Sequence, residues 1–138
     1  MKVHDSVAFS FPGSLDSPNQ WTWRPWFVYA RIKKTWKKRV RLAFLQNATA
    51  RRSAPANCFA QVRISCYRHR LLDVDNLYGS VKPLLDGLKA TKLIADDDPA
   101  SIDLKVEQFA ILRSAPQFTH VQIIYSRIEA KDFAGSGE

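Results

Sequence analysis

The stretch that decides the fold is FAQVRISCY, residues 59–67, because apolar and polar side chains alternate along it. Ala60, Val62, Ile64 and Cys66 fall on one side of an extended chain, and the residues between them fall on the other. Alternation this regular predicts a β-strand with one buried side.

Helices and strands are predicted on both sides of this strand. Pro25 is well placed to start a long helix from Trp26, and residues 7–11 form a short first strand. The remaining predicted elements are a second helical segment and two further strands, at residues 75–90, 104–111 and 120–125. The order β-α-β-α-β-β predicts an α+β fold, a mixed β-sheet with helices packed on it.

A length of 138 residues with 46% hydrophobic content suits one domain. We expect this domain over residues 1–130 and a disordered tail over 131–138, where little could pack. No stretch approaches a membrane span and no signal peptide is apparent, so we expect no membrane partner and a cytoplasmic location. Cys58 and Cys66 lie too far apart along one strand to bond, which predicts two buried thiols.

Charge is distributed unevenly along the chain. Residues 1–70 carry 14 Lys and Arg against two acids, whereas residues 71–103 carry seven aspartates against three lysines. The net charge of +8 indicates a polyanionic partner such as nucleic acid. A compact acidic segment within a basic protein would repel phosphate unless a cation lies between them. We call residues 71–103 the acidic segment.

Two groups of aspartates stand out in the acidic segment. Asp73 and Asp75 follow the strand over 59–67, and if the chain is still extended there, both carboxylates point the same way. The run at 96–98 precedes a proline, and by itself this pattern is typical of a solvated turn. Between the groups, Pro83 either kinks the second helix or lies in its first turn, with regular helix from near Ser80. Both alternatives leave Lys82 near the start of a regular helix.

The residue types fit a hard cation. Mg²⁺ takes a few carboxylate oxygens, keeps waters and lets substrate phosphate complete its shell. An EF-hand is excluded because its glycine position is Tyr78 and its bidentate glutamate position is Leu84. Histidines and cysteines show no zinc-ligand spacing, and no P-loop, Rossmann glycine pattern or nucleophile elbow is present.

Three stretches of the acidic segment form a recognisable series: Asp73-Val-Asp75-Asn76-Leu77, then Lys82-Pro-Leu-Leu-Asp86-Gly-Leu, then Leu93-Ile-Ala-Asp96-Asp97. This series resembles the RusA family of Holliday-junction resolvases. The similarity extends over roughly residues 7–112 and is specific between 70 and 98. The chain departs from the family by three extra residues, 79–81, and by Leu71-Leu72, where the family often has arginines.

The resemblance implies a RusA-like fold and a homodimer that makes paired nicks in a four-way DNA junction. It also implies that Asp73, Asp75 and Asp97 bind Mg²⁺, for which Mn²⁺ can substitute. Asp96 would assist them, and Lys82 would be the essential cation at the scissile phosphate.

The expected function is therefore a Mg²⁺-dependent, structure-selective endodeoxyribonuclease acting on branched DNA. The side chains expected to contact DNA come from the first helix, the loop over 47–57 and the end of the strand over 59–67: Lys33, Lys37, Arg51, Arg52, Arg68 and Arg70. Two alternatives remain open. One is a DNA-binding accessory module that does not cleave; the other is an Asp-x-Asp glycosyltransferase, which the short chain disfavours.

Overall fold

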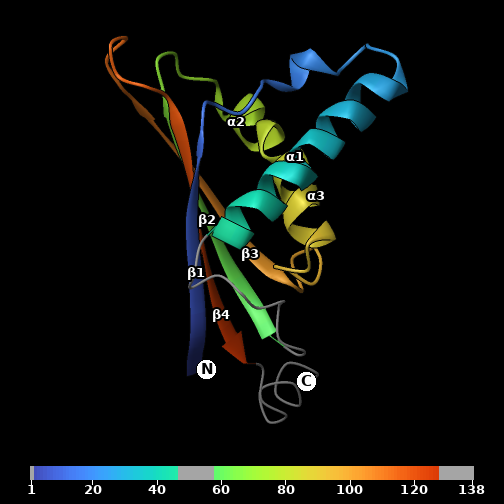
Figure 1. Cartoon of the computed structure of the whole chain (residues 1–138), viewed down its shortest axis with the longest axis vertical. Coiled ribbons are helices and arrows are strands. Elements are labelled where there is room, and N and C mark those ends of the chain that lie inside the picture. The colour runs from blue at the N-terminus through green and yellow to red at the C-terminus, as the bar shows by residue number, and fades with distance from the viewer. Residues whose placement is uncertain (1, 47–57, 128–138) are drawn as a thin grey trace.

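The computed structural model describes residues 2–46 and 58–127. Its strands are β1 (Lys2–Pro12), β2 (Cys58–Arg68), β3 (Ile102–Ala110) and β4 (Phe118–Arg127). Its helices are α1 (Trp26–Gln46), α2 (Val74–Ser80) and α3 (Lys82–Ala90), with a 3-10 turn, η1 (Pro18–Gln20), before α1. These elements form a single small α+β domain with a four-stranded mixed sheet, as the sequence predicts (Figure 1).

The sheet has the strand order β1-β4-β2-β3. Strand β4 is antiparallel to both β1 and β2, whereas β2 and β3 are parallel. A parallel pair needs a crossover connection, and residues 69–101, with α2 and α3, provide it. The acidic segment is therefore mostly this crossover.

One face of the sheet is packed against the helices, which lie together on one side of it (Figure 1). The predicted alternation in β2 is confirmed, because Ala60, Val62, Ile64 and Cys66 are all buried. The residues between them point to the other side, which no described element covers. We call that side the open face.

Helices α1 and α3 pack closely across Gly87. An added Cβ at Gly87 would lie 3.0 Å from Val40 Cγ2 and 3.1 Å from the Trp36 carbonyl oxygen. Trp36 and Val40 are buried, so this contact fixes the basic helix α1 against the helix that carries Lys82.

The predicted second helix is two helices that meet at Val81. Pro83 lies in the first turn of α3, where its missing N–H costs no helical hydrogen bond. Lys82 is the first residue of α3. The prediction of a regular helix that starts close to Ser80, with Pro83 in its first turn, is confirmed to within two residues.

Other predicted segments have different boundaries in the structure or lie outside the described residues. Strand β1 is longer than the expected 7–11 because its pairing with β4 runs from Lys2 to Pro12, with one register shift between Val3 and Asp5. The predicted loop at 47–57 and tail at 131–138 lie outside the described residues. Cys66 is buried, and burial raises the pKa of its thiol to about 11. None of the helices in residues 2–46 and 58–127 has the length and apolar character of a membrane span.

Candidate cation and nucleic-acid site

The first pair of aspartates lies at the start of α2. Asp73 is the N-cap, and its carboxylate accepts hydrogen bonds from the backbone N–H and the side-chain amide of Asn76, at 2.8 and 3.1 Å. Asp75 is already in the first helical turn and is exposed. The assumption that the chain is still extended at Asp75 is therefore wrong, and residues two apart on a helix do not face each other.

The second acidic group contacts α3. Lys82 Nζ lies 3.9 Å from Asp97 Oδ2, and Lys89 Nζ lies 3.1 Å from Asp96 Oδ1. The Asp97 N–H and Lys89 hold the pKa of the Asp96 carboxyl below its ordinary value, and the bond to Asp96 raises the pKa of Lys89. Asp98 is a turn residue, as expected, because its carboxylate accepts from the Ser101 N–H at 2.9 Å.

A third contact ties this group to α1. The Tyr29 hydroxyl donates to Asp86 Oδ2 at 2.6 Å. Burial, this bond and the charges of Asp86 and Asp97 hold the pKa of Tyr29 well above its ordinary value. Sequence reasoning missed Tyr29, whose spacing indicates only a core position on a helix. It also gave Asp86 no role, although the quoted Lys-x-x-x-Asp motif contains it.

The aspartates do not form a closed metal cage. In residues 2–46 and 58–127, no group of three or more His, Cys, Asp or Glu side chains could hold a metal ion. The structure brings Asp97 to Lys82 but does not gather Asp73, Asp75 and Asp97 into one such group. Their oxygen donors nevertheless suit Mg²⁺, which is usually held by one or two carboxylates together with waters and substrate phosphates.

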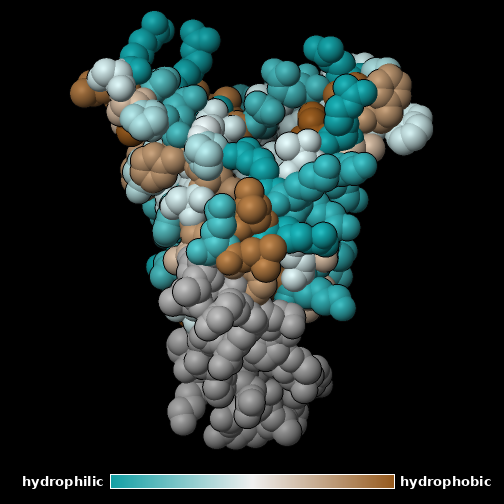
Figure 2. All heavy atoms as spheres, viewed as in Figure 1, coloured by the Kyte–Doolittle hydropathy of each residue, from teal (hydrophilic) through white to brown (hydrophobic). Residues whose placement is uncertain are grey.

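Basic side chains surround the outer face of α1. Lys33 and Lys37 are exposed, as a DNA contact requires. A hollow of about 170 Å³ on the helix is lined by Lys34, Lys37, Lys38 and Arg41. Hydrophilic side chains dominate this side of the molecule, at the right of Figure 2. Arg70 is also exposed, whereas Arg51 and Arg52 lie outside the described residues.

Arg68 has a different role from the one expected. Its side chain is only 7% exposed. Nη1 donates to the Leu15 carbonyl at 2.8 Å, and Nε donates to the Arg70 carbonyl at 3.2 Å. Burial lowers the pKa of the guanidinium from its ordinary value. Arg68 thus holds the loop after β1 against the end of β2, which corrects the expectation that it contacts DNA.

No protein-family model and no curated protein matches this chain. The function therefore has to be inferred from the residues of the site.

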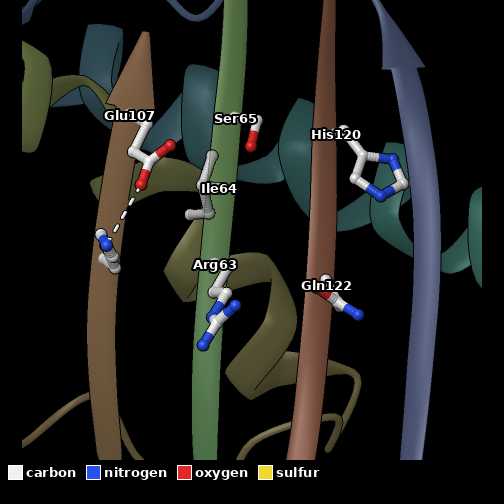
Figure 3. A pocket seen from close by; sticks show the side chains of 7 residues that line it. Arg63, Ile64, Ser65, Glu107, His120 and Gln122 are labelled. Atoms are coloured by element: carbon white, nitrogen blue, oxygen red, sulfur yellow. Dashed lines mark ion pairs between the residues drawn. The ribbon is translucent and has the colours of Figure 1, made fainter.

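A second group of polar residues lies on the open face (Figure 3). Strands β2, β3 and β4 line a hollow of about 190 Å³ there, with Arg63, Ser65, Lys105, Glu107, His120 and Gln122 among its residues. Lys105 pairs with Glu107 at 3.3 Å, and His120 Nδ1 hydrogen-bonds Ser10 Oγ at 2.8 Å. The sheet separates this hollow from the aspartates. Sequence reasoning could not find it without the strand order.

Proposed function

We propose that this chain is a Mg²⁺-dependent, structure-selective endodeoxyribonuclease with a RusA-like fold that acts on branched DNA. The observation that carries the proposal is the contact between Lys82 and Asp97. Two motifs that are separate in sequence supply a cation and a carboxylate to one place, beside the hydrogen-bonded pair of Tyr29 and Asp86.

The charge distribution supports a phosphate-bearing substrate. Helix α1 carries seven Lys and Arg and no acid. It packs on α3, so the basic surface and the acidic segment lie on the same side of the sheet. Basic side chains bind the phosphate backbone without regard to sequence, and this binding weakens as salt rises. The carboxylates of the acidic segment would repel the phosphate backbone, and a bound cation would neutralise that repulsion.

The chain's own residues would share the remaining work. One or two of the carboxylates of Asp73, Asp75 and Asp97, with help from Asp96, would hold the ion together with waters and substrate phosphate, and when bound Mg²⁺ would supply the Lewis acidity for phosphodiester hydrolysis. The Lys82 side chain is 59% exposed and can therefore reach a phosphate. Its charge would stabilise the extra negative charge of the transition state, and Asp97 would orient it. The proposal includes a homodimer that makes paired nicks.

Cleavage of a synthetic four-way junction with Mg²⁺ or Mn²⁺ tests this proposal. We expect Asp75→Asn to lose about 100-fold or more of the cleavage rate while junction binding is kept. The matched control is Asp103→Asn, an exposed aspartate on β3, which should cleave like the wild type. Cleavage that survives Asp75→Asn would contradict the ligand assignment.

A DNA-binding module that does not cleave is the second candidate. It is favoured by one observation, the lack of a group of three metal-ligating side chains among the described residues. Junction affinity that falls with salt, without nicking at any metal concentration, would establish this candidate and refute the nuclease.

A further inference from the structure

Two tryptophans are displayed at the start of α1. Trp23, which precedes α1, is 98% exposed and Trp26, the first residue of α1, is 81% exposed, whereas Trp36 further along α1 is buried. Tryptophan side chains usually bury a large apolar area in cores and interfaces. Two such side chains left in solvent within four residues indicate a contact surface. We call residues 21–26 the tryptophan turn.

The tryptophan turn is held in place. Trp23 has φ 67°, in the left-handed region that bulky residues rarely adopt. Its neighbours are anchored, because the Thr22 N–H and hydroxyl both donate to the Pro18 carbonyl, at 2.9 and 2.8 Å. The Trp21 ring packs on Tyr29 with 5.4 Å between centroids. These contacts therefore fix the backbone directly before Trp23, whose side chain is exposed.

The tryptophan turn lies next to the candidate site. Pro18 packs so closely on Gly79 of α2 that an added Cβ there would lie 2.5 Å from Pro18 Cγ. Tyr29, which supports Trp21, also donates to Asp86 of α3. Figure 1 shows the segment between β1 and α1 at the end of the molecule where α2 lies. A partner that contacts the tryptophans would therefore approach the acidic segment.

Charge identifies the class of partner. Residues 17–46 carry eight Lys and Arg and no acid, so the partner is a polyanion. Nucleic acid combines phosphates with flat bases, and unpaired bases stack on aromatic side chains. An anionic membrane fits less well, because the exposed large apolar side chains of α1 lie at its two ends, Trp26 and Phe27 at one and Leu42 and Leu45 at the other. The seven Lys and Arg between them leave no continuous apolar helix face for lipid.

We propose that Trp23 and Trp26 stack on unpaired bases at a branch point of DNA. A duplex presents no free base faces, whereas bases at a branch can be unstacked by an inserted side chain at modest cost. The two tryptophans would thus provide the preference for branched over linear DNA. This inference takes its substrate class from the proposed function but does not depend on cleavage.

Binding measured in EDTA tests the inference separately from catalysis. We expect Trp23→Ala and Trp26→Ala each to weaken binding to a four-way junction by about five-fold or more, the smallest loss a base–aromatic stack predicts. Binding to a duplex of equal length should be unchanged, and Trp23→Phe should keep most of the junction affinity. The matched control is Leu112→Ala, which removes a 77% exposed side chain between β3 and β4 and should have no effect.

Tryptophan fluorescence provides a second readout. Junction DNA should quench the emission of the wild type, and a variant with both Trp23→Phe and Trp26→Phe should lose most of that quenching. Unchanged junction affinity in both alanine variants would overturn the inference, as would equal losses on junction and duplex. A blue shift with phosphatidylserine vesicles but no response to DNA would also overturn it and indicate a membrane contact. If the wild type nicks junctions and both alanine variants keep its preference for junction over duplex, only this inference is refuted. If the alanine variants lose that preference but the wild type does not nick, only the nuclease proposal is refuted.

Discussion

Replacing the buried Arg68 with methionine should destabilise the fold and leave the proposed DNA contacts in place. The change removes two hydrogen bonds from a charged donor, to the carbonyls of Leu15 and Arg70. Each such bond contributes roughly 1.5–3 kcal/mol, and the methionine regains part of the loss by packing, so we expect a net loss of about 2–4 kcal/mol. In a domain of this size, that loss lowers Tm by roughly 10 °C.

Thermal melts followed by circular dichroism would measure this loss, with Arg70→Met as the matched control. Arg70 is exposed, so its replacement should leave Tm unchanged and weaken junction binding in EDTA. Arg68→Met should do the opposite when binding is measured well below its Tm. A wild-type Tm for Arg68→Met together with weaker DNA binding would refute this structural role and support a DNA contact for Arg68.

Three further changes test packing and titration. Gly79→Ala should destabilise the fold by about 1–2 kcal/mol despite the better helix propensity of alanine, because its Cβ meets Pro18, and Pro18→Ala should restore the loss in a double variant. In a Cys58→Ser background, Cys66 should not react with Ellman's reagent at pH 8 until the protein is unfolded. Because burial raises the pKa of the folded thiol to about 11, the free energy of unfolding should fall as pH rises from the ordinary pKa of a thiol to about 11. Tyr29→Phe should lower the free energy of unfolding by about 1 kcal/mol at neutral pH. Because the pKa of the Tyr29 phenol is raised in the folded state, the wild type should lose stability above pH ~10, and Tyr29→Phe should lose less. An equal loss of stability above pH ~10 in both proteins would contradict this explanation.

The sequence predicts correctly those helices and strands that depend on residues close together in the chain. Strand β2 follows from strict alternation, and α1 begins at Trp26, directly after Pro25, as expected. The position of Lys82 at the start of a helix followed from Pro83, because proline cannot donate a hydrogen bond within a helix. These features depend on residues within a few positions of each other.

Features that depend on distant residues could not be read from the sequence. The insertion of β4 between β1 and β2 is a choice among strand pairings that local pattern leaves open. The burial of Arg68 needs the Leu15 carbonyl, 53 residues away in sequence. The family resemblance suggested that Lys82 and Asp97 lie close together, but only the structure shows that they are in contact. The orientation expected of Asp75 was wrong because Asp73 caps α2 and the helix starts before Asp75.

The parallel pairing of β2 and β3 makes the site dependent on an edge strand. Within the described sheet, β3 is hydrogen-bonded to β2 only, and the crossover that carries both aspartate groups is anchored at its two ends by these strands. Detachment of β3 would release the end of the Asp97 turn that leads into it and the two Gln108–Leu72 hydrogen bonds next to Asp73, while the three antiparallel strands stay paired. Such local opening requires less free energy than global unfolding. The proposed nuclease activity would then be lost on heating before the helical signal changes, and amide exchange along β3 would report the opening.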